Sequence, residues 1–162
     1  GHRHLFVLPV EGGTPRQVTT GPYDHGAPAW TPDGRALVFS ANRREDRERM
    51  PRDTDLWRLD IETGELTRLT DRFGPDGSPA VARDGRIAWV GYDDEFQGYQ
   101  TRRLYVMDAD GGGRRALAPG LDRSPGGPVW SHDGRGLFVD YDSEGTGRLA
   151  FVTLDGEVTE LA

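Results

Sequence analysis

Short apolar segments alternate with polar turns along the whole chain, and no stretch keeps the 3.6-residue apolar period of a helix for a useful length. The apolar segments are rich in Val, Leu, Phe and Trp, residue types that favour β-strands. Residues 66–70 (Leu-Thr-Arg-Leu-Thr) alternate cleanly, as a strand with one solvated face does. The pattern therefore predicts an all-β protein with almost no helix.

One segment recurs three times at a spacing close to 50 residues. Its copies contain Asp-Gly-Arg triplets at residues 33–35, 84–86 and 133–135, which lie 51 and 49 residues apart. Each triplet stands between two apolar runs. Asp-Gly is a favoured two-residue hairpin turn because both positions tolerate positive φ, so we expect such a turn at Asp33-Gly34 and at its copies. A fixed spacing of this size indicates a repeat architecture.

The repeat divides the chain into three four-stranded units and a shorter start. The units are residues 21–70, 71–118 and 119–162, while residues 1–20 supply two strands that correspond to the third and fourth strands of a unit. Four-stranded antiparallel units of this length are typical of β-propeller blades, and closed propellers have four to eight of them. We expect a single propeller domain of about three and a half blades in an incomplete ring.

Composition limits the partners and the chemistry. The net charge of −7 disfavours nucleic acid, and no run of 18 apolar residues indicates a membrane span. The chain has no cysteine, which excludes disulfides, thiolate catalysis and cysteine-based zinc sites. No signal-peptide pattern opens the sequence, and we expect a cytoplasmic location.

Three further motifs suggest metal or phosphate binding at first sight but are better explained as turns. His132 occupies a repeat position that Pro32 and Arg83 fill in the sister units. Residues 108–111 begin like a calcium loop but lack the third oxygen ligand and the closing Glu. The glycines at 111–113 are followed by neither a helix pattern nor a Lys-Ser/Thr pair. We therefore predict no metal site and no cofactor.

Two copies of the repeat carry a resemblance to a known family. Residues 27–35 (Ala-Pro-Ala-Trp-Thr-Pro-Asp-Gly-Arg) and 127–135 (Gly-Pro-Val-Trp-Ser-His-Asp-Gly-Arg) resemble the propeller repeat shared by TolB and the prolyl oligopeptidase family of serine peptidases. The resemblance extends over the whole chain. Four segments resemble more particularly the acylaminoacyl-peptidase branch: residues 40–46, 55–57, 91–94 and 103–108.

The resemblance implies a propeller, typically seven-bladed, that caps an α/β-hydrolase domain carrying a Ser, Asp, His triad. This chain departs from the family in having no Gly-x-Ser-x-Gly elbow, so no catalytic residue can be assigned. We expect the chain itself to be inactive, with the hydrolase domain absent from it. The implied role is to gate the access of short peptides and to pack on the hydrolase domain of the parent chain.

Two other interpretations remain open. The TolB resemblance implies a non-enzymatic propeller that mediates protein–protein interaction. Alternatively, a half-ring could close by self-association. An incomplete array leaves two open edges, and such edges tend to pair with another chain, so we also expect a homo-oligomer.

Two long polar connections are the candidate contact regions. Both link the second strand of a unit to the third, so both should emerge on the same face of the ring, whereas the third unit has only a short connection near 142–147. A solvated charge cluster of mixed sign is the alternative explanation. The predicted substrate or interface contacts are Arg43, Arg44, Glu45, Asp46, Arg47, Asp93, Asp94, Glu95 and Tyr99.

Overall fold

The computed structural model describes residues 1–162 as 14 strands in four antiparallel sheets, without a helix. A half-blade contains β1 (Phe6–Val7) and β2 (Arg16–Gln17). The first blade contains β3 (His25–Trp30), β4 (Ala36–Ala41), β5 (Asp55–Asp60) and β6 (Leu66–Arg68). The second contains β7 (Asp76–Val81), β8 (Ile87–Gly91), β9 (Arg103–Met107) and β10 (Arg115–Leu117), and the third β11 (Val129–Trp130), β12 (Gly136–Ser143), β13 (Thr146–Thr153) and β14 (Val158–Glu160). The predicted all-β propeller fold is confirmed.

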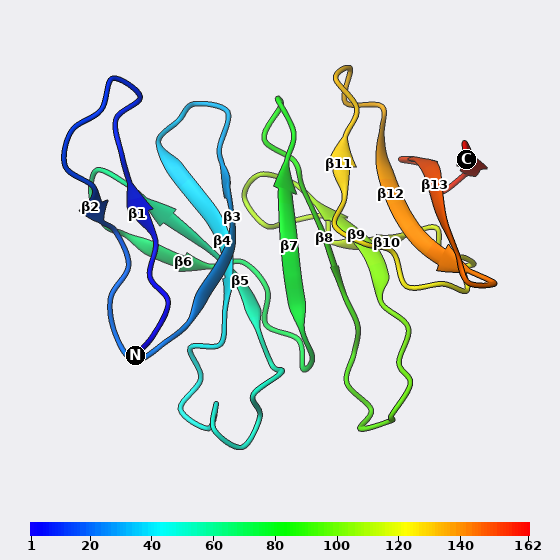
Figure 1. The fold of residues 1–162 in the computed structure, drawn as a ribbon, viewed down its shortest axis with the longest axis horizontal. Helices are drawn as coiled ribbons and strands as arrows, with labels where there is room; N and C mark the ends of the chain where they lie inside the picture. Colours follow the sequence, from blue (N-terminus) through cyan, green and yellow to red (C-terminus); the bar gives the residue numbers. More distant parts are fainter.

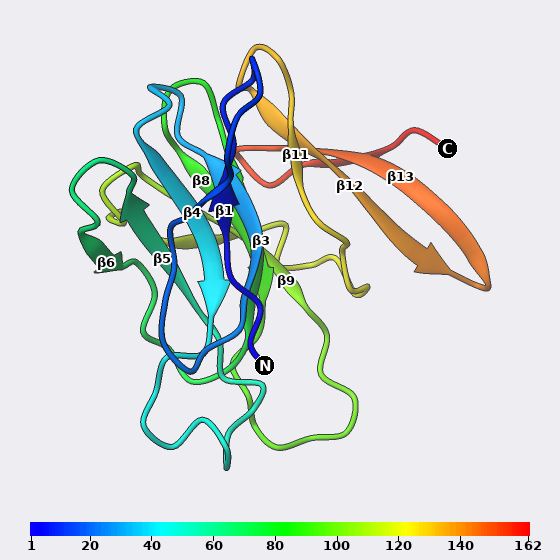
Figure 2. The same cartoon turned by 60° about the vertical axis from the view of Figure 1, so that its left-hand side comes forward.

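The sheets follow one another in chain order, like neighbouring blades of a fan (Figures 1 and 2). Within each four-stranded blade the strands pair in sequence order, and the first strands lie next to each other, β3 against β7 and β7 against β11. The connections 42–54 and 92–102 hang from the same edge of the array, as predicted (Figure 1). The Asp-Gly-Arg turns lie at the opposite edge.

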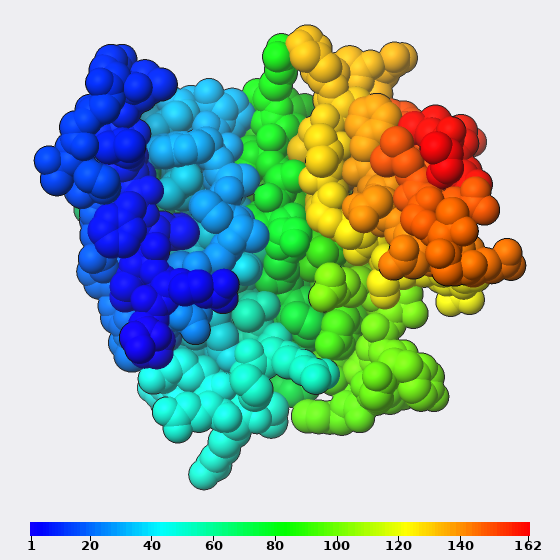
Figure 3. Space-filling model, in the orientation of Figure 1, coloured from blue at the N-terminus to red at the C-terminus, as the bar shows by residue number.

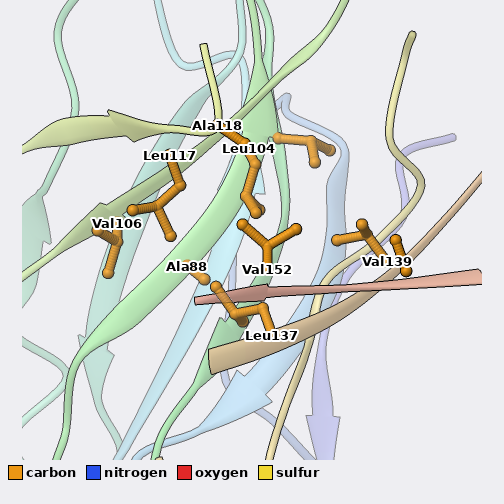
Figure 4. Packing of buried hydrophobic residues seen from close by; sticks show 10 residues of the cluster. Ala88, Leu104, Val106, Leu117, Ala118, Leu137, Val139 and Val152 are labelled. Carbon is orange, nitrogen blue, oxygen red and sulfur yellow. The ribbon is translucent and has the colours of Figure 1, made fainter. Parts of the chain in front are cut away.

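The core consists of apolar layers between adjacent blades. Between the second and third blades the buried residues include Ala88, Leu104, Leu137 and Val152 (Figure 4). The strands β4 and β8 are buried almost throughout, because each lies between two neighbouring blades and contacts apolar side chains on both faces. This explains why their sequences are continuous apolar runs rather than alternating ones.

The expected two-residue turns at Asp-Gly are wrong. The N–H of Gly34 donates to the carbonyl of Thr31 at 2.9 Å, and Thr31 N–H donates to Ala36 at 2.9 Å, so Pro32 and Asp33 are the central residues. Only the glycine has positive φ, at 68°. The N–H groups of Gly85 and Gly134 close the same turn, although Arg83 and His132 replace the proline there. In all three copies the aspartate accepts a hydrogen bond from the backbone N–H of the following arginine, which favours this longer geometry over the two-residue one.

A two-residue turn occurs instead between β12 and β13. There Glu144 and Gly145 both have positive φ, 52° and 76°, and join residues that pair directly across the hairpin. Both strands consequently run to the turn, which is why the third blade has no loop comparable with those of the first two.

Candidate functional site

The two long loops flank a cleft of about 330 Å³, which we call the loop cleft. Residues 49–53 of one loop form one wall, and Asp94 with residues 96–98 of the other loop forms the opposite wall. Phe73, from the connection between β6 and β7, also lines it. The space-filling view shows the loops as separate projections with a hollow between them (Figure 3).

An internal ion pair holds the first loop. Arg44 Nε lies 3.0 Å from Asp53 Oδ2 and 3.2 Å from Asp46 Oδ1, and only the second contact is aligned as a hydrogen bond. Asp53 is buried and its other oxygen accepts the Gly74 N–H at 3.0 Å, which ties the loop to the connection before β7. The bond from Arg44 to Asp46 and the charge of Asp53 raise the pKa of the Arg44 guanidinium. These contacts of Asp53 with Arg44 and Gly74 hold the first wall of the loop cleft, residues 49–53, in place.

Arg43 packs into the blade rather than toward the cleft. Its Cζ lies 4.3 Å from the centre of the Tyr23 ring, and its Nη1 lies 3.0 Å from His25 Nε2. The other ring nitrogen of His25 lies 3.0 Å from the carbonyl of Arg3, an arrangement that suits a neutral ring protonated on Nδ1. Burial, with a further contribution from the Arg43 charge, lowers the pKa of His25. Arg43 and this histidine thus form a structural pair.

Gln100 organises the second loop, although no sequence pattern pointed to it. Its Oε1 accepts hydrogen bonds from the backbone N–H groups of Glu95 at 3.0 Å and Gln97 at 3.3 Å. Its Nε2 donates to the carbonyl of Asp93 at 2.5 Å. A single amide side chain that satisfies three backbone groups of its own loop leaves no periodic signal, so only the structure reveals it.

Two aromatic side chains of the second loop are presented to solvent. Phe96 is 73% exposed and its ring centre lies 5.4 Å from that of Phe73, so one of its sides faces the loop cleft. Tyr99 is 86% exposed. Large exposed aromatic groups on a loop are typical of contact surfaces, since burial on binding removes their apolar area from water.

The nine predicted contact residues do not form one site. Of them only Asp94 lines the loop cleft. Arg43 and Arg47 share the ring of Tyr23, while Asp93 lies 3.4 Å from Arg72. Their role in contacts stays a prediction. The remaining five hold the first loop together or are exposed: Arg44, Asp46, Glu45, Glu95 and Tyr99.

A buried carboxylate stands at the base of the first loop. Asp55 is fully buried at the start of β5 and accepts hydrogen bonds from Arg68 Nε at 3.0 Å and Nη2 at 2.7 Å. Burial raises the pKa of Asp55 to about 6; the Arg68 charge opposes this rise, and the charges of Asp53 and Asp76 add to it. The folded protein therefore takes up a proton here at a pH where the unfolded chain does not.

The exchange Asp55→Asn should remove this pH dependence. The pKa of Asp55 in the folded protein, about 6, exceeds its value in the unfolded chain. The contribution of Asp55 to the free energy of unfolding is therefore greatest below about pH 4 and is lost as pH rises through about 6. A difference of about two pK units corresponds to roughly 3 kcal/mol. The free energy of unfolding of wild type minus that of the variant should fall by about this amount between pH 4 and pH 7, as measured by urea unfolding.

The matched control is Asp71→Asn. The Arg114 hydrogen bond lowers the pKa of Asp71, so the contribution of Asp71 to the free energy of unfolding is lost as pH falls rather than as it rises. For Asp55→Asn, a difference in the free energy of unfolding between wild type and variant that does not change with pH would contradict the prediction.

No group of three or more His, Cys, Asp or Glu side chains is arranged to hold a metal ion. The structure contains no helix long and apolar enough to cross a membrane.

Comparison with known proteins identifies relatives of this chain. Residues 1–98 match the family model of the dipeptidyl peptidase IV (DPP IV) N-terminal region. The chain is 30% identical over 113 residues to the uncharacterized protein Atu1656 of Agrobacterium fabrum, covering 68% of this chain and 34% of that protein. It is 28% identical over 111 residues to the uncharacterized peptidase YuxL of Bacillus subtilis, covering 51% of this chain and 17% of that one. The chain therefore spans about a third or less of these relatives.

Among solved structures, TolB from Acinetobacter baumannii superimposes with a TM-score of 0.75 at 20% identity. The match covers 98% of this chain and 37% of that one. At this identity the likeness shows the fold alone.

Proposed function

The chain belongs to the family of dipeptidyl peptidase IV N-terminal regions, and on that basis we propose that it is the non-catalytic propeller portion of a serine peptidase. The peptidase would be of the acylaminoacyl-peptidase or prolyl oligopeptidase kind. The similarity to the peptidase YuxL supports the same proposal. The observation that carries it is the family match over residues 1–98, which include the first of the two long loops.

In this role the face that bears the two loops limits which peptides reach a hydrolase domain of the parent chain. The loop cleft supports the proposal because its first wall is fixed by Asp53 and its second exposes Phe96. A rigid wall opposite an apolar projection can admit an extended peptide and exclude a folded one. The residues 1–162 then act by positioning and exclusion, not by bond cleavage.

The test uses the full-length protein and the double exchange Phe96→Ala, Tyr99→Ala. Truncating Phe96 should widen the loop cleft, and truncating the exposed Tyr99 removes bulk from the same loop outside it. The value of kcat/KM for a peptide of about ten residues should therefore rise severalfold relative to that for an aminoacyl anilide. The control is Val10→Ala, which alters a side chain that is 95% exposed on the β1–β2 turn, away from the loops. The isolated chain should hydrolyse neither substrate.

Two results would contradict the proposal. If the ratio of kcat/KM for the longer peptide to that for the anilide is unchanged in the double variant, the loops do not limit peptide access. A full-length protein that hydrolyses no peptide but binds a protein partner through its propeller would favour the TolB-like interaction protein instead.

A further inference from the structure

Two arginines of the first loop, residues 42–54, have no partner inside the protein. The loop contains five arginines, and three of them contact other side chains: Arg43, Arg44 and Arg47. The guanidinium groups of Arg49 and Arg52 make no hydrogen bond, ion pair or cation–π contact, and both residues are exposed. Both line the loop cleft on its first wall. Guanidinium groups in this state are free to bind a carboxylate, often through two parallel N–H···O bonds.

The carboxylates that line the loop cleft do not neutralise this wall. Asp53 lies 3.0 Å from the Nε of Arg44, which offsets its charge. On the opposite wall, Asp94 accepts a backbone N–H of its own loop at 2.8 Å. Glu45 and Glu48 belong to the first loop but do not line the cleft. The wall formed by the first loop therefore presents two positive charges that no neighbouring side chain has bound.

The rest of the loop cleft offers apolar surface. Met50 and Pro51 come from the first loop, and Phe73 and Phe96 line the cleft as well. A volume of about 330 Å³ lies at the small end of the range for ligand pockets. It suits one or two side chains of a peptide rather than a folded domain. A ligand that fits both features carries an apolar group next to an anion.

The second loop positions Phe96 before any ligand arrives. Phe96 has a positive φ of 58°, a backbone conformation that is rare for a bulky residue. Three successive backbone N–H groups accept this geometry by donating to side chains of the loop, Phe96 to Asp94 and both Glu95 and Gln97 to Gln100. The ring is nevertheless 73% exposed, so burial does not compensate for the strain. Strain of this kind is concentrated at ligand-binding sites.

We propose that the loop cleft binds an extended peptide segment in which a large apolar side chain neighbours a glutamate or an aspartate. The apolar side chain packs against Met50 and Phe96, and the carboxylate receives hydrogen bonds from Arg49 and Arg52. The side-chain oxygen of Gln97 makes no hydrogen bond in the structure and is available to a backbone N–H of the segment. The cleft then selects peptides by charge as well as by width.

The shape of the cleft favours an acidic side chain over the carboxylate of a chain terminus. The two loops project as separate lobes, and the hollow between them is open to solvent (Figure 3). A peptide can therefore continue past the site rather than end in it. The inference rests on the proposed function only in taking this segment as part of a substrate, because the binding itself needs no catalytic domain.

The experiment measures peptide binding to residues 1–162 by isothermal titration calorimetry. The probe is the hexapeptide Ala-Ala-Phe-Glu-Ala-Ala, acetylated and amidated so that its only carboxylate is the glutamate. Related peptides carry Gln for Glu, or Ala for Phe, and both should bind more weakly. The double exchange Arg49→Gln, Arg52→Gln should weaken binding of the probe on the order of tenfold, and added salt should weaken binding to the wild type.

The matched control is Arg102→Gln. Arg102 is exposed at the end of the second loop, its side chain makes no hydrogen bond or ion pair, and it does not line the loop cleft. Its exchange removes one positive charge from the same edge of the array and should leave binding of the probe unchanged. Thermal unfolding of all variants should give the wild-type Tm, because none of the exchanged guanidinium groups has a partner to lose.

The full-length protein separates this inference from the proposed role in peptide access. There the double arginine exchange should raise KM for the Phe-Glu peptide and leave KM for its Gln counterpart unchanged. The width of the cleft is unaffected, since Phe96 remains. If truncating Phe96 and Tyr99 alters access but the arginine exchange does not alter binding, only this inference fails. If the probe binds residues 1–162 but the full-length protein hydrolyses no peptide, only the role of the segment as a substrate fails.

Three outcomes would overturn the proposal. Absence of probe binding, or equal affinity for the Glu and Gln peptides, would exclude recognition of the carboxylate. An equal loss of binding in Arg102→Gln would show that the charge of the whole edge, not the cleft, attracts the peptide. Tighter binding of acetyl-Ala-Ala-Phe with a free carboxyl end, lost in the double variant, would make a chain terminus the ligand.

Discussion

Replacing Arg72 with Ala should lower the free energy of unfolding by about 3–5 kcal/mol. Asp76 is fully buried at the start of β7 and receives hydrogen bonds from Arg72 Nε at 2.9 Å and from Trp89 Nε1 at 2.8 Å. The same guanidinium donates to the Tyr105 hydroxyl at 2.7 Å and lies 4.3 Å from that ring. Without Arg72 the buried Asp76 carboxylate loses its counter-charge. The Tyr105 ring, which stacks on Trp89 with ring centres 5.3 Å apart, loses the guanidinium that packs against it.

Arg114→Ala is the control for this prediction. Arg114 Nη1 also makes a short ion pair, 2.7 Å from Asp71 Oδ1, but both side chains are largely exposed. Solvent screens such a pair, so its loss should cost less than about 1 kcal/mol. Denaturant unfolding of the two variants separates the cases, and a loss for Arg72→Ala no larger than that for Arg114→Ala would contradict the argument.

The repeat predicted most of the fold because strand and turn signals are local. Apolar runs such as 36–40 and 87–91 mark buried strands wherever they stand, and the recurrence of Asp-Gly-Arg orders them into blades. The predicted turn geometry was wrong because the Asp-Gly pair alone does not show which hydrogen bonds the aspartate side chain makes. Asp33, Asp84 and Asp133 each accept a bond from the backbone N–H of the following arginine, and this holds the longer turn in all three copies.

The site was less predictable because its contacts join residues far apart in the sequence. Asp53 and Gly74 are separated by 21 residues, and Arg43 and His25 by 18. Charge alone grouped Arg43 with the loop, whereas the structure turns it toward Tyr23 and His25. A sequence shows which side chains a loop contains, but the packing of its neighbours decides which of them face outward.

Gly91→Ala should cost about 3 kcal/mol, at the upper end for overpacking. Gly91 pairs with Asp76 across β8 and β7, and a Cβ atom there would overlap the carbonyl of Pro75, the Asp76 carboxylate and the Arg72 guanidinium. The carbonyl is backbone and the carboxylate is held by Trp89, so neither can move cheaply. The added methyl group therefore forces the strands apart at the ion pair.

Gly77→Ala is the matched control for this change. Gly77 lies on β7 next to Asp76, and nothing stands within 4 Å of the position that its Cβ would take. Its replacement should leave stability within about 1 kcal/mol of wild type. Equal losses for the two glycine variants in urea unfolding would show that the close approach at Gly91 carries no energetic weight.

The double variant Arg72→Ala, Gly91→Ala tests whether the two effects share one cause. Removing the Arg72 side chain frees part of the space that the new methyl group needs. The Asp76 carboxylate has then already lost its bond to Arg72, so its displacement by the methyl group breaks no ion pair. The double variant should therefore lose less stability than the sum of the single losses, by about 1 kcal/mol or more. Strict additivity would mean that Gly91 acts on the strand pairing alone, because independent sites add.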